Sequence, residues 1–402
     1  MTARVVLLAG LAATAALAAG LFVGGGRAGR PGITDTPVYR TYGERMAGGD
    51  MPYRDFVVEY PPGALAPFVL PALVSSSAHG YDIAFKTLMV LALIAVTVLV
   101  VLSLVALRGS TSRIALSVGA LLAGTVLLGS FALTRFDLYA AAVTLAAVCA
   151  ILHRRRALGP ALLGVAIATK LYPAVLLPLL VVRTWRSEGR AAALRGLALA
   201  VGTALAIYLP FAIVAPEGVA RSIWRQLGRP LQIESLGSGV LLALHHAFGM
   251  PLAWASSSGS QNLTGTVAGV AATLTTLVGV AALLLVWVRF ARGDATGDAR
   301  FARYAAAAVV AFVAFGKVVS PQFLVWLLGV VVLVQGRRGI TAMALLLAAC
   351  ALTRLWFPRT YWELVKQFDP TASWLVLVRD LVLVSLFAVL VVRVRAREPG
   401  PA

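Results

Sequence analysis

Long apolar runs separated by short polar loops form the dominant pattern of this chain. The runs recur at about 20 residues, the length that an α-helix needs to cross a hydrocarbon core of ~30 Å. Such segments form helices, because a helix satisfies its own backbone hydrogen-bonding groups where no water is available. We therefore predict an all-α, polytopic integral membrane protein with about ten to twelve transmembrane helices. No soluble domain is expected, so residues 1–402 are predicted to form one transmembrane domain.

Three segments need a more specific interpretation. Residues 5–23 follow a basic residue and are expected to be a retained first span rather than a cleaved signal peptide. Residues 64–78 are apolar but short and contain two prolines, which favours a re-entrant or interfacial piece. Residues 157–182 are interrupted at Lys170-Leu171-Tyr172-Pro173 and have basic flanks at both ends. We predict two half-helices that meet near Lys170, because broken helices persist in membranes only where they line a polar cavity.

The composition supports the membrane class, and the charge pattern predicts its orientation. Hydrophobic residues make up 60% of the chain and charged residues 13%, against about 45–50% and 25% in soluble proteins. The net charge of +19 does not indicate nucleic-acid binding, because 19 of the 35 Lys and Arg residues fall in short loops predicted to share one side. Four of the sixteen acids share that side. By the positive-inside rule, the basic loops and both termini are expected in the cytoplasm of a multi-pass plasma-membrane protein.

Three longer polar loops are then predicted on the extracytoplasmic side, at residues 24–63, 216–239 and 353–372. The first contains the longest polar stretch in the chain and holds five of the sixteen acids. An acid-rich loop of this kind in an otherwise apolar protein is expected to carry its chemistry. The five acids are Asp35, Glu44, Asp50, Asp55 and Glu59.

Charged residues in or beside apolar segments are costly and are therefore functional candidates. Arg135 and Asp137 are close enough in sequence to pair with each other in a purely structural role. Lys170 has no acid within twelve residues in either direction, so its partner is either a distant structural acid or an anionic group of a substrate. Lys317 stands in a similar polar break, Lys317-Val318-Val319-Ser320-Pro321-Gln322.

A carboxylate beside several cations suits one reaction type. The carboxylate acts as general base toward a hydroxyl, and the cations hold a phosphate and stabilise its leaving charge. The chain has no GxxxxGK[ST] motif, so a soluble nucleotide is not predicted. Cys149 and Cys350 lie in apolar runs without metal-ligand spacing, and no metal or other cofactor is expected.

Several motifs together resemble a known family. The order is Asp35 with Tyr39, Pro52-Tyr53-Arg54-Asp55-Phe56, Glu59-Tyr60-Pro61-Pro62, Arg135-Phe136-Asp137, Lys170-Leu171-Tyr172-Pro173, Arg229-Pro230-Leu231-Gln232-Ile233-Glu234-Ser235 and Lys317-x-x-Ser320-Pro321-Gln322. This set, spread over residues 34–326, resembles the actinobacterial polyprenol-phosphate-dependent α-mannosyltransferases of the GT-C superfamily. One departure concerns a histidine that some relatives place near the donor phosphate, because Lys317 stands at that position here.

The resemblance implies a mannosyl unit on a polyprenol phosphate as donor. The implied acceptor is a hydroxyl of an outer-leaflet glycolipid or lipoglycan, with no nucleic-acid partner. Asp35 is implied as the base of an inverting single displacement. The phosphate is expected at Lys170, Lys317 and Arg135, with Arg229 behind them. Acceptor binding or support of the loop is expected from Tyr39, Asp55, Glu59, Tyr60, Asp137, Glu234 and Gln322.

Three other functions remain open from the sequence. The same fold could use an arabinosyl or glucosyl donor, because sugar choice depends on pocket contacts that no short motif shows. A lipid or solute transporter or flippase would also use broken helices and intramembrane lysines, although such proteins commonly show internal repeats and none is visible here. A catalytically silent relative is the third alternative.

Overall fold

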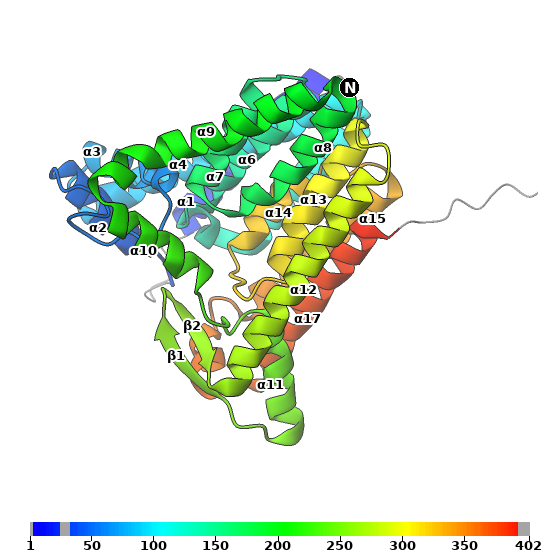
Figure 1. Cartoon of the computed structure of the whole chain (residues 1–402). Coiled ribbons are helices and arrows are strands. Elements are labelled where there is room, and N and C mark those ends of the chain that lie inside the picture. The colour runs from blue at the N-terminus through cyan, green and yellow to red at the C-terminus, as the bar shows by residue number, and fades with distance from the viewer. Residues whose placement is uncertain (1–2, 25–32, 393–402) are drawn as a thin grey trace, which may run out of the picture.

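The computed structural model of the protein describes residues 3–24 and 33–392. It is almost entirely helical, with one β-hairpin (Figure 1). The helices are α1 (Ala3–Gly24), α2 (Thr36–Ala47), α3 (Ala66–Val74), α4 (Ala78–Ala106), α5 (Thr111–Leu128), α6 (Asp137–Leu152), α7 (Leu158–Thr169), α8 (Leu177–Glu188), α9 (Arg190–Val214), α10 (Pro216–Leu227), α11 (Leu236–Phe248), α12 (Thr266–Ala291), α13 (Asp298–Ala314), α14 (Phe323–Val331), α15 (Gly336–Trp356), α16 (Tyr361–Gln367) and α17 (Pro370–Val391); the strands are β1 (Ala253–Ser257) and β2 (Ser260–Thr264).

The described residues contain seven helices that are long and apolar enough to cross a membrane. Shorter apolar helices such as α6 and α7 pack among them. This confirms the predicted helical, polytopic membrane class, while part of the predicted set of spans consists of short or broken helices. The seven long segments are Arg4–Leu21, Ala78–Ala106, Thr111–Leu133, Arg190–Val214, Thr266–Ala291, Gly336–Trp356 and Pro370–Val391.

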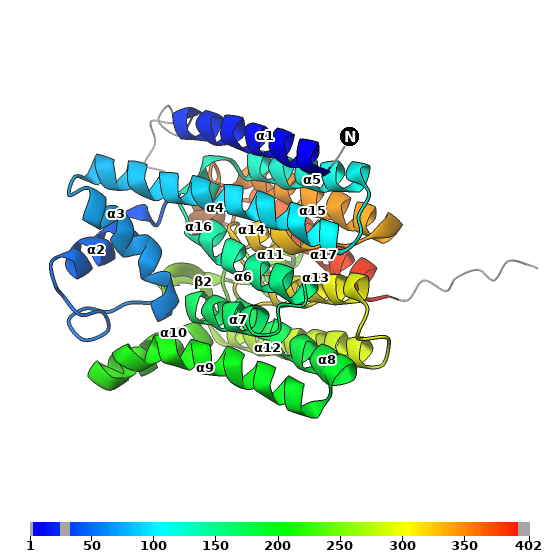
Figure 2. The same cartoon turned by 90° about the horizontal axis from the view of Figure 1, so that it is seen from above.

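The short helices α13 and α14 lie inside the bundle, and the long helices surround them (Figures 1 and 2). Every residue of α14 is buried. In contrast, α9 and α12 are apolar but largely exposed in the structure, as expected for helices that face lipid. Figure 2 shows α1 beside α4 and α5 at the edge opposite α9. There the hydroxyls of Thr14 and Thr97 lie 3.2 Å apart.

The predicted break at Lys170 is confirmed. Helix α7 ends at Thr169, and Lys170 has an extended backbone with φ −157° and ψ 145°. A 3₁₀ turn at Tyr172–Leu176 follows, and α8 begins at Leu177. Pro173 has no backbone N–H to continue the hydrogen bonding of α7. The break therefore ends α7 at a charged side chain, inside the bundle.

The first polar loop is partly helical and is held against the bundle. Its helix α2 carries Tyr39, which stacks on Phe68 of α3 at a centroid distance of 4.4 Å. The corner at Pro61 leads to Gly63, whose backbone lies against the end of α7. A Cβ at Gly63 would stand 2.7 Å from the carbonyl oxygen of Ala168, so only glycine fits there. This contact fixes the loop next to Lys170.

The β-hairpin was not predicted, and neither was the helical part of residues 216–239, where α10 forms. Strands β1 and β2 pair in register from Ala253↔Thr264 to Ser257↔Ser260. Residues 231–233 attach to β2, because Ile233 N–H donates to Gln261 O at 3.0 Å. The same segment also contacts the polar break before α14, because the Gln232 N–H donates to Lys317 O at 2.9 Å. The hairpin therefore positions two of the motifs found in the sequence beside each other.

Small residues allow α7 and α9 to pack closely. A Cβ at Gly164 of α7 would lie 2.3 Å from the carbonyl oxygen of Ala200 and 2.8 Å from the Cβ of Thr203. Because lipid tails are as apolar as side chains, such close packing is a main source of helix association in membranes.

Gly164→Leu is therefore expected to separate α7 from α9 and to cost about 1–3 kcal/mol of stability, the usual range for overpacking. Gly202→Leu on α9 is the matched control, because a Cβ there meets nothing within 4 Å. Thermal unfolding of both variants in detergent measures the difference. Equal melting temperatures for the two variants would contradict the close packing.

Candidate active site

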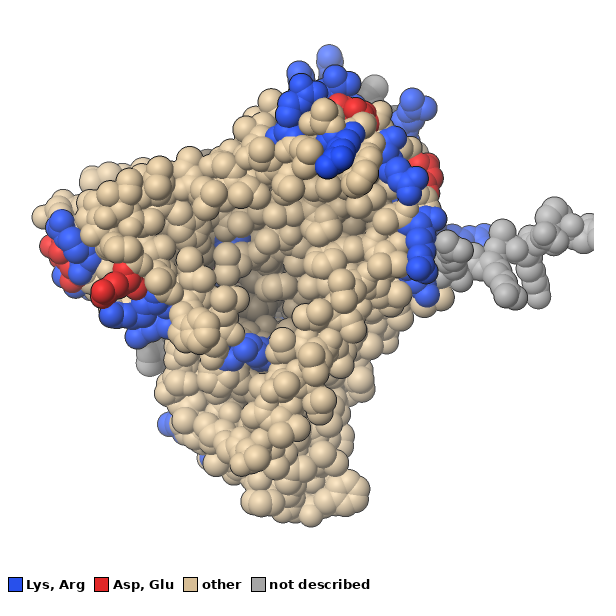
Figure 3. All heavy atoms as spheres, viewed as in Figure 1, with Lys and Arg blue, Asp and Glu red and all other residues tan. Residues whose placement is uncertain are grey.

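A cavity of about 630 Å³ lies between the first polar loop, the break after α7, the 226–234 segment and the polar break before α14. The space-filling view shows a hollow in the middle of one face of the molecule, with basic side chains at its rim (Figure 3). Segments distant in sequence meet here, and they bring together most of the candidates from the sequence. The candidates that line the cavity are Asp35, Tyr39, Glu59, Tyr60, Arg135, Asp137, Lys170, Arg229, Glu234, Lys317 and Gln322.

Asp55 is the one candidate that does not line the cavity. Its carboxylate accepts hydrogen bonds from the Met51 N–H at 2.8 Å and from Arg54 at 2.8 and 2.9 Å. The Arg54 hydrogen bonds lower the pKa of Asp55 to about 2. These contacts close the turn between Met51 and Asp55, so of the two expected roles only support of the loop fits this position.

Asp35 stands immediately before α2, with a side chain that is 31% exposed. Its carboxylate accepts a hydrogen bond from the Tyr39 hydroxyl at 3.3 Å and forms an ion pair with Arg135. The Arg135 side chain is buried and also donates to Ile33 O at 3.2 Å. The arginine therefore fixes the carboxylate from the protein side and leaves part of it open to the cavity.

Asp137 and Lys170 form a second ion pair deeper in the protein. The Lys170 Nζ lies 2.6 Å from Asp137 Oδ1, and the indole N–H of Trp326 donates to the same oxygen at 2.8 Å. The Lys170 ammonium also lies 4.4 Å from the ring centroid of Phe136, within the range of cation–π attraction. The local pair between Arg135 and Asp137, which the sequence left open as a structural alternative, is not formed, because each binds a more distant partner. Of the two partners considered for Lys170, the structure contains the acid.

Arg229 and Lys317 are the cavity cations that have no carboxylate partner within the described residues. The Lys317 ammonium donates to Leu227 O at 2.9 Å. The Arg229 Nε is buried and has no hydrogen-bond partner among the described residues; the Arg135 Nε is in the same state, but Arg135 is already ion-paired with Asp35. A buried unsatisfied donor on a charged group costs free energy unless a ligand satisfies it. Arg229 and Lys317 are therefore the ones available to bind an anion.

Two further carboxylates line the cavity in different environments. The Glu59 side chain is 31% exposed and lies 3.8 Å from Arg225. Glu234 is buried, with its side chain accepting from Gln232 and its backbone oxygen accepting from Arg379 at 2.6 Å. Burial raises the pKa of Glu234 to about 7, although the nearby Arg379 opposes the shift. Glu59 is thus accessible from the cavity, whereas Glu234 is held in its wall.

Several cavity residues were not identified from the sequence. Trp326 packs face to face on Tyr172 at 4.1 Å and hydrogen-bonds Asp137. Tyr361 and the hairpin turn at residues 258–261 complete the wall. The aromatic density of the third polar loop was a usable signal for Tyr361, but no pattern in residues 250–265 marked the hairpin as part of a site.

The described residues contain no group of three or more His, Cys, Asp or Glu side chains arranged to hold a metal ion. The cavity offers two partly exposed carboxylates, Asp35 and Glu59, together with two cations that have no carboxylate partner among the described residues. A hydroxyl can therefore lose a proton to a carboxylate, and a phosphate can be bound by the cations.

The fold and the cavity define a helical, multi-pass membrane protein with a polar site enclosed by its helices. The model of glycosyltransferase family 87 matches residues 56–321, more than half of the chain. The chain belongs to this family and is a membrane glycosyltransferase.

The chain is also similar to two solved structures of ArnT from Cupriavidus metallidurans. The first, bound to undecaprenyl phosphate, has a TM-score of 0.47 and 14% identity, over 89% of this chain and 72% of that chain. The second, in the apo state, has a TM-score of 0.46 and 16% identity, over 90% and 73%. No curated protein matches the chain.

Removing one member of the Asp137–Lys170 pair is expected to leave a buried charge without a partner. Lys170→Met alone should therefore cost about 3–5 kcal/mol, and Asp137→Asn alone should also be destabilising. The double variant removes both charges and should recover most of the loss. Thermal unfolding of the four proteins forms a double-mutant cycle, and additive effects of the two changes would contradict the pairing.

The raised pKa of Glu234 predicts a pH-dependent stability. The pKa of Glu234 is about 7 in the folded protein, against an ordinary value of 4.5 for a Glu side chain. Between these two pH values the folded state therefore binds more protons than the unfolded state. Stability should therefore fall as the pH rises through this window, by an amount on the order of 3 kcal/mol. Glu234→Gln should be more stable than the wild type at pH 8 and similar at pH 4.

Melting temperatures measured from pH 4 to pH 8.5 test this, with the exposed Glu363→Gln as a control for the same chemical change. A difference between Glu234→Gln and the wild type that does not vary with pH would show that Glu234 is not protonated in the folded protein.

Proposed function

We propose that this member of family 87 transfers a mannosyl unit from a polyprenol-phosphate donor to a hydroxyl of an outer-leaflet glycolipid or lipoglycan. Its fold is then of the GT-C type, and its site faces the extracytoplasmic side. The proposal rests on the side chains that line the cavity. The accessible carboxylate of Asp35 lines it together with Arg229 and Lys317, two cations that have no carboxylate partner in the part of the chain that the structure describes.

Asp35 is the general base of the proposed reaction. The acceptor hydroxyl oxygen attacks the anomeric carbon while its proton passes to the Asp35 carboxylate. A new carbon–oxygen bond forms, the bond between the sugar and the phosphate oxygen breaks, and the electron pair leaves with the phosphate. The attack comes from the face opposite the phosphate, so the configuration inverts. Arg135 and Tyr39 hold the carboxylate in place through the contacts described above.

Arg229 and Lys317 bind the donor phosphate in this proposal, because no carboxylate in residues 3–24 and 33–392 forms an ion pair with either of them. Cations around a leaving phosphate stabilise the negative charge that develops on it. Arg135 and Lys170, which the family resemblance placed at the phosphate together with Lys317, instead position Asp35 and Asp137 in this proposal. The phosphate is thus assigned to the side of the cavity formed by the 227–232 segment and the break before α14.

The apolar part of the cavity supports a lipid-linked donor. Helix α12 contributes Thr276, Gly279, Val280 and Leu283 to the lining, and α13 contributes Phe312. Because α12 is largely exposed on its other faces, the cavity borders the surface expected to contact lipid. A polyprenyl chain can then lie along α12 while its phosphate reaches the polar groups. A water-soluble donor would have no use for this apolar wall.

The proposal is tested by sugar transfer from synthetic polyprenol-phosphate mannose with purified protein and Asp35→Asn. Loss of a general base is expected to reduce the rate about 10²–10⁴-fold. The rates are compared below the melting temperatures of both proteins, because the buried Arg135 loses its ion-pair partner in this variant. Asp50→Asn is the matched control, since Asp50 lies in the same loop, pairs with Arg45 and does not line the cavity.

Wild-type turnover by Asp35→Asn would exclude Asp35 as the base. Transfer from an arabinosyl or glucosyl donor, and none from mannose, would keep the mechanism and change the sugar. No transfer from any lipid-phosphate donor, together with lipid or solute movement in liposomes, would favour a transporter.

A further inference from the structure

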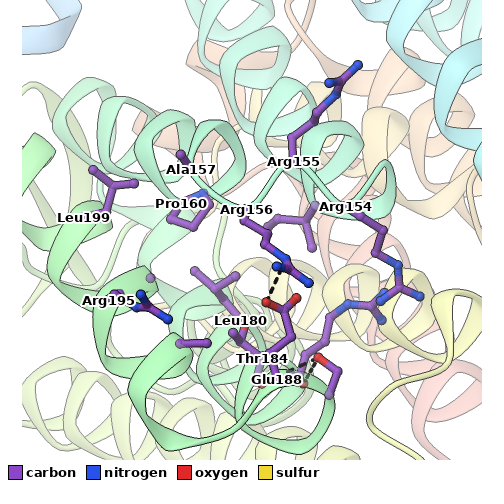
Figure 4. Close-up of a pocket in the computed structure, with 15 residues that line it drawn as sticks. Arg154, Arg155, Arg156, Ala157, Pro160, Leu180, Thr184, Glu188, Arg195 and Leu199 are labelled. Carbon is purple, nitrogen blue, oxygen red and sulfur yellow. Dashed lines mark hydrogen bonds and ion pairs between the residues drawn. The ribbon is translucent and has the colours of Figure 1, made fainter.

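A second cavity, of about 340 Å³, lies at the end of the molecule where arginines gather (Figures 3 and 4). It is formed by the connection between α6 and α7, the C-terminal part of α8 and the N-terminal part of α9. It has no lining residue in common with the candidate active site. Neither the motifs nor the proposed transfer reaction uses it.

The lining contains five arginines and a single acid, Glu188. Glu188 is paired with Arg156, whose Nε lies 2.9 Å from Glu188 Oε2. Arg183 is buried and forms the floor, where it pairs with Asp298 and donates to Thr296 O at 3.0 Å. The cavity therefore keeps a strong positive charge after its internal pairs are counted.

Arg155 and Arg195 are the lining arginines without an ion pair among the described residues, but the Arg155 side chain points away from the space (Figure 4), which leaves Arg195 available inside the cavity. Arg195 is exposed and forms no ion pair or side-chain hydrogen bond within residues 3–24 and 33–392. Figure 4 shows Arg156 and Arg195 on opposite sides of the space next to Leu180 and Thr184. Arg156 is 77% exposed, and an ion pair this exposed contributes little stability. An incoming anion can therefore share Arg156 with Glu188 and bind Arg195 at the same time.

Apolar side chains complete the lining, and they continue into the outer surface of the bundle. Pro160, Leu180 and Leu199 line the cavity beside the arginines. Just outside it, Leu194 is 53% exposed and Trp185 is 56% exposed. A tryptophan at the boundary between a basic loop and an apolar helix is typical of the membrane interface. The ligand that fits this boundary has an anionic head and an apolar body.

We propose that this cavity binds an anionic phospholipid through its headgroup phosphate. Arg156 and Arg195 donate hydrogen bonds to the phosphate oxygens, and the acyl chains lie along the exposed apolar face of α9. By the positive-inside rule the lipid belongs to the cytoplasmic leaflet, where basic pockets between transmembrane helices bind lipid phosphates. The bound lipid would tie the α6–α7 connection to α8 and α9.

Lipid binding to delipidated full-length protein in neutral detergent tests the proposal, with native mass spectrometry as the readout. Phosphatidylglycerol should bind, and zwitterionic phosphatidylcholine should bind at least about tenfold more weakly. The double variant Arg156→Gln/Arg195→Gln should weaken phosphatidylglycerol binding about 30-fold, since each arginine near an anionic lipid contributes roughly a factor of five. Arg195→Gln alone should show a smaller loss and preserves the Arg156–Glu188 pair.

The matched control is Arg186→Gln/Arg190→Gln, which removes the same charge from exposed positions outside the lining. It should bind phosphatidylglycerol like the wild type. An equal loss of phosphatidylglycerol binding in the control would show that general surface charge attracts the lipid, and this would overturn the proposal of a specific site. Unchanged binding by both cavity variants would also overturn it. Glycerol 3-phosphate serves as the soluble probe, and binding as tight as that of phosphatidylglycerol would overturn the lipid assignment.

Discussion

The burial of charge is the constraint on which the interior of this protein depends. Asp137 and Lys170 lie in a part of the bundle where an unpaired charge is costly, and their side chains form an ion pair at 2.6 Å. The pair joins the start of α6 to the break after α7, and Trp326 extends it to α14. The consecutive helices α6 and α7 are thereby held together with α14, which lies far from them in sequence. The broken helix is the geometry that allows Lys170 to reach inward.

The same rule separates the cavity cations into two groups. Arg135 and Lys170 form ion pairs with Asp35 and Asp137, so these two cations hold carboxylates of the protein and are not free to bind a further anion. Arg229 and Lys317 have no such partner among the described residues and retain the capacity to bind one. A cation that positions a catalytic group and a cation that binds a substrate phosphate can be alike in sequence. Only their partners in three dimensions distinguish them.

The two cavities have similar linings but are assigned different roles. Both combine cations with apolar walls next to exposed apolar helices, which suits amphiphilic anions. The larger cavity adds an accessible carboxylate and therefore has a group that can take up a proton. Among the described residues the smaller cavity has one lining carboxylate, Glu188, and neither the sequence motifs nor the proposed transfer reaction involves it. Chemistry is thus proposed for the first cavity and binding alone for the second.

The sequence by itself determined the class of the protein and identified many of the charged residues that line the larger cavity. Apolar runs of membrane-spanning length, the break at Lys170 and the costly charges are local properties, and local properties are readable from a sequence. The partners were not readable, because Asp137 is 33 residues from Lys170 and Asp35 is a hundred residues from Arg135. The hairpin at residues 253–264 was also decided by tertiary contacts, since its strand β2 pairs with the segment that carries Glu234. Tertiary packing determined which of the possible pairings form, because the sequence did not distinguish among them.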